Sequence, residues 1–80
     1  MKTGKLKNFK EELNNSAIEL YGNKRVIIFD CKSVIDYSDE IIILDLNTVK
    51  LKIKGENLTV DSFVFGQTDI SGEICGLEFV

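Results

Sequence analysis

Four carboxylates within residues 36–45 are the first candidates for chemistry, because hard cations prefer closely spaced oxygen ligands. These carboxylates are Asp36, Asp39, Glu40 and Asp45. An EF-hand loop needs acidic residues at alternate positions, a central glycine and a distant glutamate, and this spacing does not provide them. Ser38 and Asp39 are typical turn residues instead, since their short side chains bond to nearby backbone groups. We interpret the cluster as a solvated turn and expect no metal site.

Cys31 and Cys75 are the candidate nucleophiles of a chain that contains no histidine. A thiol becomes reactive beside a base or a positive charge, and Lys32 points to the opposite face of the strand that carries Cys31. The cysteines form no C-x-x-C pair, so neither a zinc site nor a thioredoxin-like site is indicated. We expect both thiols to be reduced and packed as small hydrophobic side chains. The residue inventory predicts no enzymatic activity, no cofactor and no small-molecule substrate.

Phe63 and Phe65 alternate along a predicted strand, an arrangement that can stack on the bases of an oligonucleotide. No arginine accompanies them, and their surroundings are acidic. Nucleic-acid binding requires basic residues that neutralise phosphates, so we expect no nucleic-acid partner. Packing in the core or in a protein interface is the favoured interpretation of these two rings.

The net charge of −3 is unevenly distributed along the 80 residues. Residues 1–25 contain six Lys or Arg and three Glu, a net of +3, whereas residues 26–80 contain four Lys and ten carboxylates, a net of −6. Such asymmetry directs the N-terminus toward anionic lipid or an acidic protein surface, although Lys-rich ends also serve solubility alone.

The elements that position these residues begin with a basic amphipathic helix predicted over residues 1–16. Leu6, Phe9 and Leu13 recur at helical spacing, with Lys10 and other polar residues on the remaining face. A one-stripe helix of about ten residues is marginal alone in water, so it must dock on the domain, a neighbouring subunit or a membrane. Leu6, Phe9, Lys10 and Leu13 are therefore the candidate contacts with a partner or a membrane.

From Ala17 the hydrophobic period changes to two and predicts a single β domain over residues 17–80. The predicted strands are residues 17–21, 24–31, 33–37, 40–46, 49–54, 58–65 and 68–79. Turns are expected at Gly22-Asn23, Ser38-Asp39, Asn47-Thr48, residues 55–57 and Gly66-Gln67, with a bulge near Asp61-Ser62. About six or seven short strands favour a small all-β antiparallel meander or sandwich, with a short β-solenoid-like coil as the alternative.

The segment 41–44 is apolar on both faces, so both faces must be buried against other parts of the protein or against another copy. Ile42 and Leu44 occupy one face, and Ile41 and Ile43 the other. The segment is either central in a two-layer sandwich or part of a homo-oligomeric interface through Ile41 and Ile43.

Three ordered elements resemble the YabP/YqfC family of sporulation proteins from endospore-forming Firmicutes. They are Val34-Ile35-Asp36-Tyr37-Ser38-Asp39-Glu40-Ile41, Leu51-Lys52-Ile53-Lys54-Gly55-Glu56-Asn57-Leu58, and Ile70-Ser71-Gly72-Glu73-Ile74 followed by Leu77-Glu78-Phe79. The resemblance covers about two-thirds of the chain. It looks closer to the YqfC branch, because a short basic segment precedes the first strands.

The resemblance implies a non-enzymatic protein made in the mother cell during sporulation, acting with a membrane protein as its partner. The matching residues Gly55, Leu58, Gly72, Ile74 and Phe79 are expected to be structural. No signal peptide or membrane span is visible in the sequence, so we expect a cytoplasmic location, at most peripheral to a membrane. A self-assembling structural protein of the developing spore is the alternative function.

Overall fold

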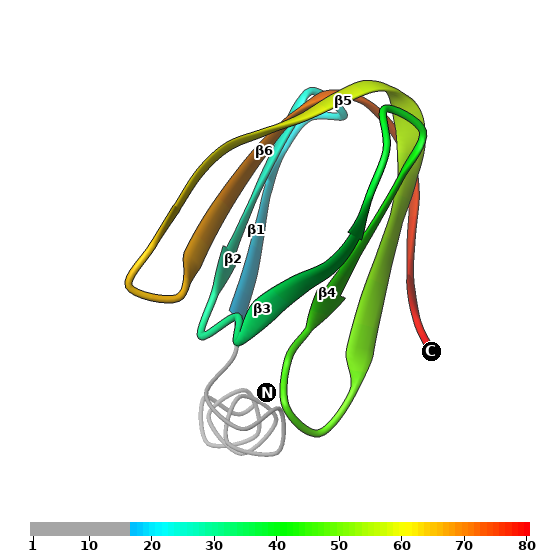
Figure 1. Cartoon of the computed structure of the whole chain (residues 1–80). Helices are drawn as coiled ribbons and strands as arrows, with labels where there is room; N and C mark the ends of the chain where they lie inside the picture. The colour runs from blue at the N-terminus through cyan, green and yellow to red at the C-terminus, as the bar shows by residue number, and fades with distance from the viewer. Residues whose placement is uncertain (1–16) are drawn as a thin grey trace, which may run out of the picture.

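The computed structural model describes residues 17–80, which form six antiparallel strands in one sheet (Figure 1). The predicted N-terminal helix, with Leu6, Phe9, Lys10 and Leu13, lies outside the described residues. The strands are β1 (Ala17–Tyr21), β2 (Arg25–Phe29), β3 (Ser33–Tyr37), β4 (Ile41–Asp45), β5 (Lys50–Val64) and β6 (Gln67–Phe79). The all-β prediction is confirmed, and the antiparallel pairing excludes the solenoid-like coil.

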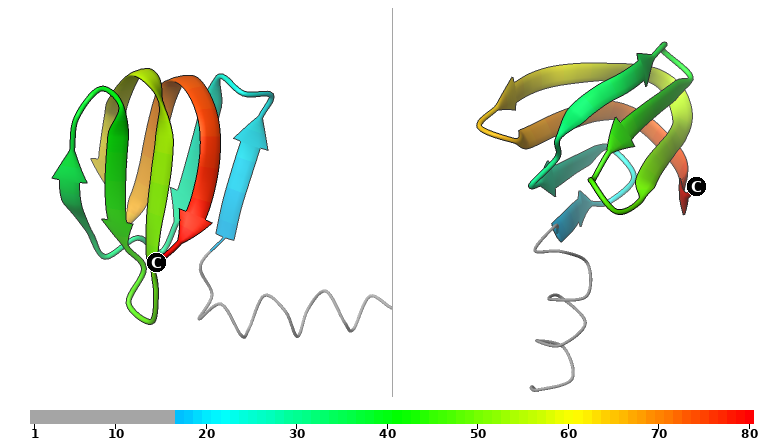
Figure 2. Two further views of the ribbon diagram at one scale, coloured as in Figure 1. Left: turned by 90° about the vertical axis from the view of Figure 1, so that its right-hand side faces the viewer. Right: turned by 60° about the horizontal axis from the view of Figure 1, so that its bottom comes forward.

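The sheet has the order β1-β2-β6-β5-β4-β3 and bends so strongly that its two halves face each other. The two long strands β5 and β6 run through both halves and turn over at the top of Figure 1. One half contains β1, β2, the end of β5 and the start of β6, and the other contains β3, β4 and the remaining parts of β5 and β6. A single sheet thereby becomes a two-layer sandwich, and Figure 2 shows its curvature from two further sides.

The prediction that residues 49–54 and 58–65 are separate strands is wrong, because β5 continues through residues 55–57 without reversing. Asn57 adopts a positive φ of 54°, and the register with β6 shifts between Glu56 and Thr59. A register shift bends a strand and leaves its direction unchanged. The residues that resembled a turn therefore form the bend of the sandwich. The bulge expected near Asp61-Ser62 is confirmed by the shift between Val60 and Ser62.

Two of the other turns also differ from their predicted positions. The β1–β2 connection has three residues, Gly22 to Lys24, and the β5–β6 turn is centred on Phe65-Gly66 instead of Gly66-Gln67. The Asn47-Thr48 turn is confirmed, with the Leu46 N–H donating to the Val49 carbonyl.

The core lies between the two halves and is almost entirely aliphatic. Its fully buried hydrophobic side chains are Val26, Ile28, Ile42, Leu44, Leu51, Ile53 and Ile70. They come from the inward faces of β2, β4, β5 and β6, which explains the period of two in the sequence. Strand β4 is thus central to one layer, as the sandwich interpretation required, with Ile42 and Leu44 inside.

Candidate interaction surfaces

Two of the four carboxylates that resembled a cation site accept hydrogen bonds from the local backbone. Asp36 Oδ1 accepts from the Tyr37 N–H at 2.9 Å, and Asp45 Oδ1 accepts from the Asn47 N–H at 2.8 Å. Ser38 Oγ accepts from the N–H of Ile41 at 3.0 Å and closes the turn between β3 and β4. Within residues 17–80, no group of three or more His, Cys, Asp or Glu side chains has the arrangement to hold a metal ion.

The two cysteines lie in opposite environments, and neither forms a disulfide. Cys31 is buried, donates to the Ser33 carbonyl at 3.5 Å, and has its thiol pKa raised by that burial. Cys75 is exposed, so the prediction that both thiols are packed is wrong for it. The physical reason is a bulge: Lys54 pairs with Gly76 and Gly55 with Ile74, which leaves Cys75 as the extra residue between them.

Beside Cys31, the Thr68 side chain is fully buried, and its hydroxyl has no hydrogen-bond partner among residues 17–80. Burial raises the pKa of the Cys31 thiol, and the neighbouring Thr68 hydroxyl acts in the opposite direction. A thiol is a weak acceptor, so the hydroxyl's desolvation is poorly compensated.

Replacing Thr68 by Val is therefore expected to stabilise the fold by about 1 kcal/mol, since it removes a buried, unsatisfied hydroxyl while keeping the branched shape. A gain of this size raises the Tm by about 4–8 °C in a domain this small. Thermal unfolding followed by circular dichroism measures it. Thr59→Val, on an exposed position of β5, is the matched control. Equal shifts for both variants would show that the gain comes from β propensity instead.

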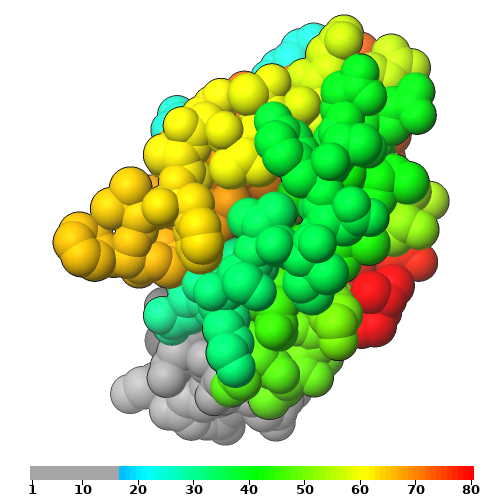
Figure 3. All heavy atoms as spheres, in the orientation of Figure 1, coloured from blue at the N-terminus to red at the C-terminus, as the bar shows by residue number. Residues whose placement is uncertain are grey.

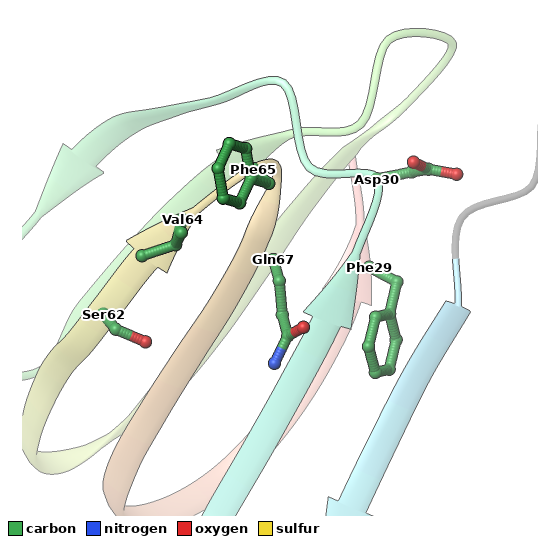
Figure 4. Close-up of a pocket in the computed structure, with 6 residues that line it drawn as sticks. All are labelled: Phe29, Asp30, Ser62, Val64, Phe65 and Gln67. Atoms are coloured by element: carbon green, nitrogen blue, oxygen red, sulfur yellow. The ribbon is translucent and has the colours of Figure 1, made fainter.

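A protruding hairpin tip joins β5 to β6 and carries three exposed apolar residues, Phe63, Val64 and Phe65. We call residues 63–65 the tip. Val64 and Phe65 line a shallow hollow of about 270 Å³ together with Phe29 and Gln67. In Figure 4, Gln67 lies between Val64 on one side and Phe29 on the other. Phe65 is fully exposed, at 102% relative accessibility, so core packing is excluded for this ring and packing in a protein interface stays a prediction. Its position in a two-residue turn places the side chain beyond the sheet.

The outward face of β4 presents Ile41 and Ile43, the residues predicted for self-association. Both are half-buried. Their direct cross-strand neighbours on β5 are Lys54 and Lys52, respectively. Cross-strand pairs on one face lie about 5 Å apart, so each isoleucine has a lysine beside it. Two copies that met through this face by symmetry would bring these lysines together, which disfavours the contact.

An apolar groove of about 340 Å³ lies between β1 and the second half of β6. Its side chains include Leu20, Ile74, Cys75 and Leu77. The β1–β2 turn is held to β6 by the Ile74 N–H, which donates to the Asn23 carbonyl at 2.7 Å. Lys24 and Glu73 form an ion pair at this end, and Lys24 lowers the pKa of the Glu73 carboxyl. We call this feature the β1/β6 groove. Sequence reasoning missed it, because its walls are far apart along the chain.

The described fold defines a small antiparallel β-sandwich domain whose notable surface features are the exposed tip and the β1/β6 groove. The chain belongs to the YabP family, a sporulation-associated family whose model matches residues 12–80. Neither the curated proteins nor the solved structures gave a significant match to this chain. Residues 17–80 contain no helix that could cross a membrane.

The family match covers Gly55 and Gly72, for which the resemblance implied structural roles, and the fold gives the reason. A Cβ at Gly55 would clash with the Glu73 carbonyl oxygen, and one at Gly72 would lie 2.6 Å from the Asn57 carbonyl oxygen. Both glycines therefore permit the close approach of β5 and β6 at the bend.

Proposed function

We propose that this protein is a non-enzymatic interaction module of sporulation that docks on a membrane-associated protein in the mother cell. Membership of the YabP family carries the proposal, since it supplies the sporulation setting. The exposed apolar tip and groove support it, because apolar surface on a small domain is typical of protein contacts. Within the family we assign the chain to the YqfC branch, on the short basic segment that precedes the first strands.

The N-terminal segment is the proposed contact with the partner or the membrane, through Leu6, Phe9, Lys10 and Leu13. Deleting residues 1–14 is expected to move the protein from the membrane fraction of sporulating cells to the supernatant. The Tm of the β domain should stay within a few degrees of the full chain, because its core comes from residues 26–74. Fractionation followed by immunoblotting measures the first effect, and circular dichroism the second.

A triple variant sharpens this test. Changing Leu6, Phe9 and Leu13 to Ser removes the apolar stripe, while Asn8→Ser, Glu11→Ser and Asn15→Ser change the same number of residues off that stripe. The first variant should lose recruitment and the second should keep it. Protease treatment of the membranes before binding distinguishes a protein partner from lipid. Unchanged recruitment after the deletion would overturn the assignment of this segment.

A self-assembling structural protein of the developing spore is the second candidate function. The specific observation in its favour is that one chain exposes both an apolar projection and an apolar groove. A strict monomer at high concentration would contradict this candidate and leave the docking function unaffected.

A further inference from the structure

One side of the sandwich is open along two unpaired strand edges. Strand β2 pairs with β6 only at residues 68–71, so among residues 17–80 the second half of β6 has β5 on one side and no strand on the other. The strand β1 is itself an edge of the sheet. In the left view of Figure 2, β1 and the second half of β6 run in opposite directions, and the β1/β6 groove lies between them.

Both edges carry core-side residues that remain half-exposed. Leu20 on β1 pairs with the fully buried Val26. Phe79 on β6 pairs with the fully buried Leu51. Cross-strand partners share a face, so Leu20 and Phe79 are on the core side, yet they are 52% and 54% exposed. Proteins commonly cover an open strand edge with a helix or a loop, and this edge needs an apolar one.

The opposite side of the sandwich is closed by a bridge between strands. Tyr37, at the end of β3, pairs with the fully buried Ile42 and is therefore on the core side. Its hydroxyl accepts from the Val60 N–H at 3.3 Å and joins β3 to the second half of β5. In Figure 3, atoms of β3 (green) lie against atoms of β5 (yellow) on this side. Tyr21, at the end of β1, bonds to Glu19 on its own strand, which leaves the β1/β6 side without such a bridge in the described part of the chain.

The chain itself supplies an element that is tethered beside the groove. Residue 16 leads directly into β1, which forms one wall of the groove. A short tether gives a high effective concentration, so contact within one molecule is favoured over contact between dilute copies. Residues 1–16 contain four Lys and two Glu, a net of +2, whereas residues 17–80 contain six Lys or Arg and eleven carboxylates, a net of −5. Opposite net charges attract the segment to the domain.

The predicted apolar stripe suits this side in its period and its length. Leu6, Phe9 and Leu13 share one face of a helix, whereas a strand would place Leu6 on the face opposite to the other two. A helix over residues 4–13 is about 15 Å long, and the five residues of β1 span about 17 Å. Residues 14–16 are Asn, Asn and Ser, which favour the turn that lets the helix run back along β1.

We propose that residues 4–13 form a helix that packs on the β1/β6 groove of the same molecule and covers it with Leu6, Phe9 and Leu13. The helix runs antiparallel to β1, which places Leu6 near Cys75 at the far end of the groove. The contact buries the stripe together with the half-exposed residues of the two edges. Ordering of the segment offsets part of this gain, so the cover is reversible.

Reversible cover controls when the stripe is available to a partner. The proposed function assigns the same three apolar side chains to the partner or the membrane, and they cannot occupy both places at once. A partner must therefore compete with the groove, and weakening the groove strengthens recruitment. Only this competition rests on the proposed function, because the cover itself needs no partner.

The two thiols report cover and folding separately, because Cys75 lines the groove and Cys31 is buried in the core. In the full-length protein, N-ethylmaleimide should react with Cys75 several-fold more slowly in the wild type than in the triple Ser variant of Leu6, Phe9 and Leu13. The off-stripe triple variant should react like the wild type. Cys31 should react equally slowly in all three proteins, since access to it requires unfolding. Peptide mass spectrometry at low micromolar protein measures both rates.

A disulfide test locates the helix in the groove. Leu6→Cys places a thiol on the stripe, and the matched control Lys7→Cys places one on the polar face, one residue further along the helix. With diamide as the oxidant, Leu6→Cys should form a disulfide with Cys75 several-fold faster than Lys7→Cys. The product should keep the mass of one chain, 9.0 kDa.

Recruitment tests the competition between groove and partner. Leu20→Asn makes the groove polar, and it should raise the ratio of membrane-bound to soluble protein in sporulating cells several-fold. Ile35→Asn changes an apolar residue of similar exposure on β3, away from the groove, and should leave this ratio unchanged. A ratio that is unchanged or lower in Leu20→Asn would overturn the competition.

Three outcomes would overturn the cover itself. The first is an equal rate at Cys75 in the wild type and the triple variant of the stripe, and the second is a disulfide that forms no faster in Leu6→Cys than in Lys7→Cys. The third is a disulfide-linked dimer in place of the intramolecular product, which would show that the stripe covers the groove of a second copy. The thiol assays contain no membrane and no partner, so failure of the cover and failure of membrane docking are distinguishable.

Discussion

Replacing Gly72 by Ala is expected to lower the free energy of unfolding by about 2–6 kcal/mol, from strain at a glycine-only φ plus overpacking. Gly72 has a φ of 135°, and an added Cβ would lie 2.6 Å from the Asn57 carbonyl oxygen and 2.9 Å from the Leu58 Cα. Both atoms belong to the backbone of β5, so relief requires the strands to separate at the bend. A domain of this size has a total stability of roughly 4–12 kcal/mol, so the substitution removes a large share of it. Urea denaturation followed by circular dichroism measures the loss.

Two other glycines are matched controls for this prediction. Gly76→Ala meets nothing closer than the Lys54 Cε at 4.0 Å, and it should be neutral or stabilising by about 0.5 kcal/mol. Gly22→Ala has open space around it but a φ of 60°, and it should cost about 1 kcal/mol from backbone conformation alone. Equal stability of Gly72→Ala and Gly76→Ala would mean that β5 and β6 do not approach closely at the bend.

Replacing Ile42 by Ala is expected to cost about 2–5 kcal/mol, because deletion of a buried aliphatic group loses its transfer free energy and leaves a cavity. Ile42 is fully buried in the centre of β4, between the two halves of the sandwich. A loss of this size lowers the Tm by about 4–8 °C per kcal/mol in a small domain. Thermal and urea unfolding together measure the effect.

The neighbouring Ile43→Ala removes the same atoms from the opposite face of the strand. Ile43 is half-buried beside Lys52, so the loss should be about 1 kcal/mol or less. The mass in solution should not change, since the lysines beside Ile41 and Ile43 disfavour a contact between copies through this face. A large loss for Ile43→Ala, or a decrease in mass, would favour the outward face of β4 as a covered interface.

Most of the strands could be predicted from the sequence, because the alternation of apolar and polar residues indicates which side chains face the core. The segment with Ile42 and Leu44 on one face is an example, and its central place in a two-layer fold followed from the same pattern. The continuity of β5 could not be predicted, since Gly55, Glu56 and Asn57 are typical of a turn. Only the pairing of this segment with β6 along its whole length keeps the strand from reversing.

The features of the candidate interaction surfaces were also predicted only in part from the sequence. Sequence reasoning identified Phe63 and Phe65 as rings that needed an explanation, and it predicted from the acidic surroundings that they do not bind a nucleic acid. It placed both cysteines in the core, whereas a bulge of one residue exposes Cys75. A bulge depends on how two strands pair, and local composition carries little information about that.

The sequence by itself determined the all-β class, the family and the inward faces of the strands, because these properties depend on residue type and short-range period. The tertiary structure alone decided that β5 and β6 bend at Gly55 and Gly72, that Phe65 projects from a strained turn, and that Leu20 lies across a groove from Leu77. These features depend on contacts between residues that are distant along the chain. Their geometry is fixed only when the two halves of the sheet pack against each other.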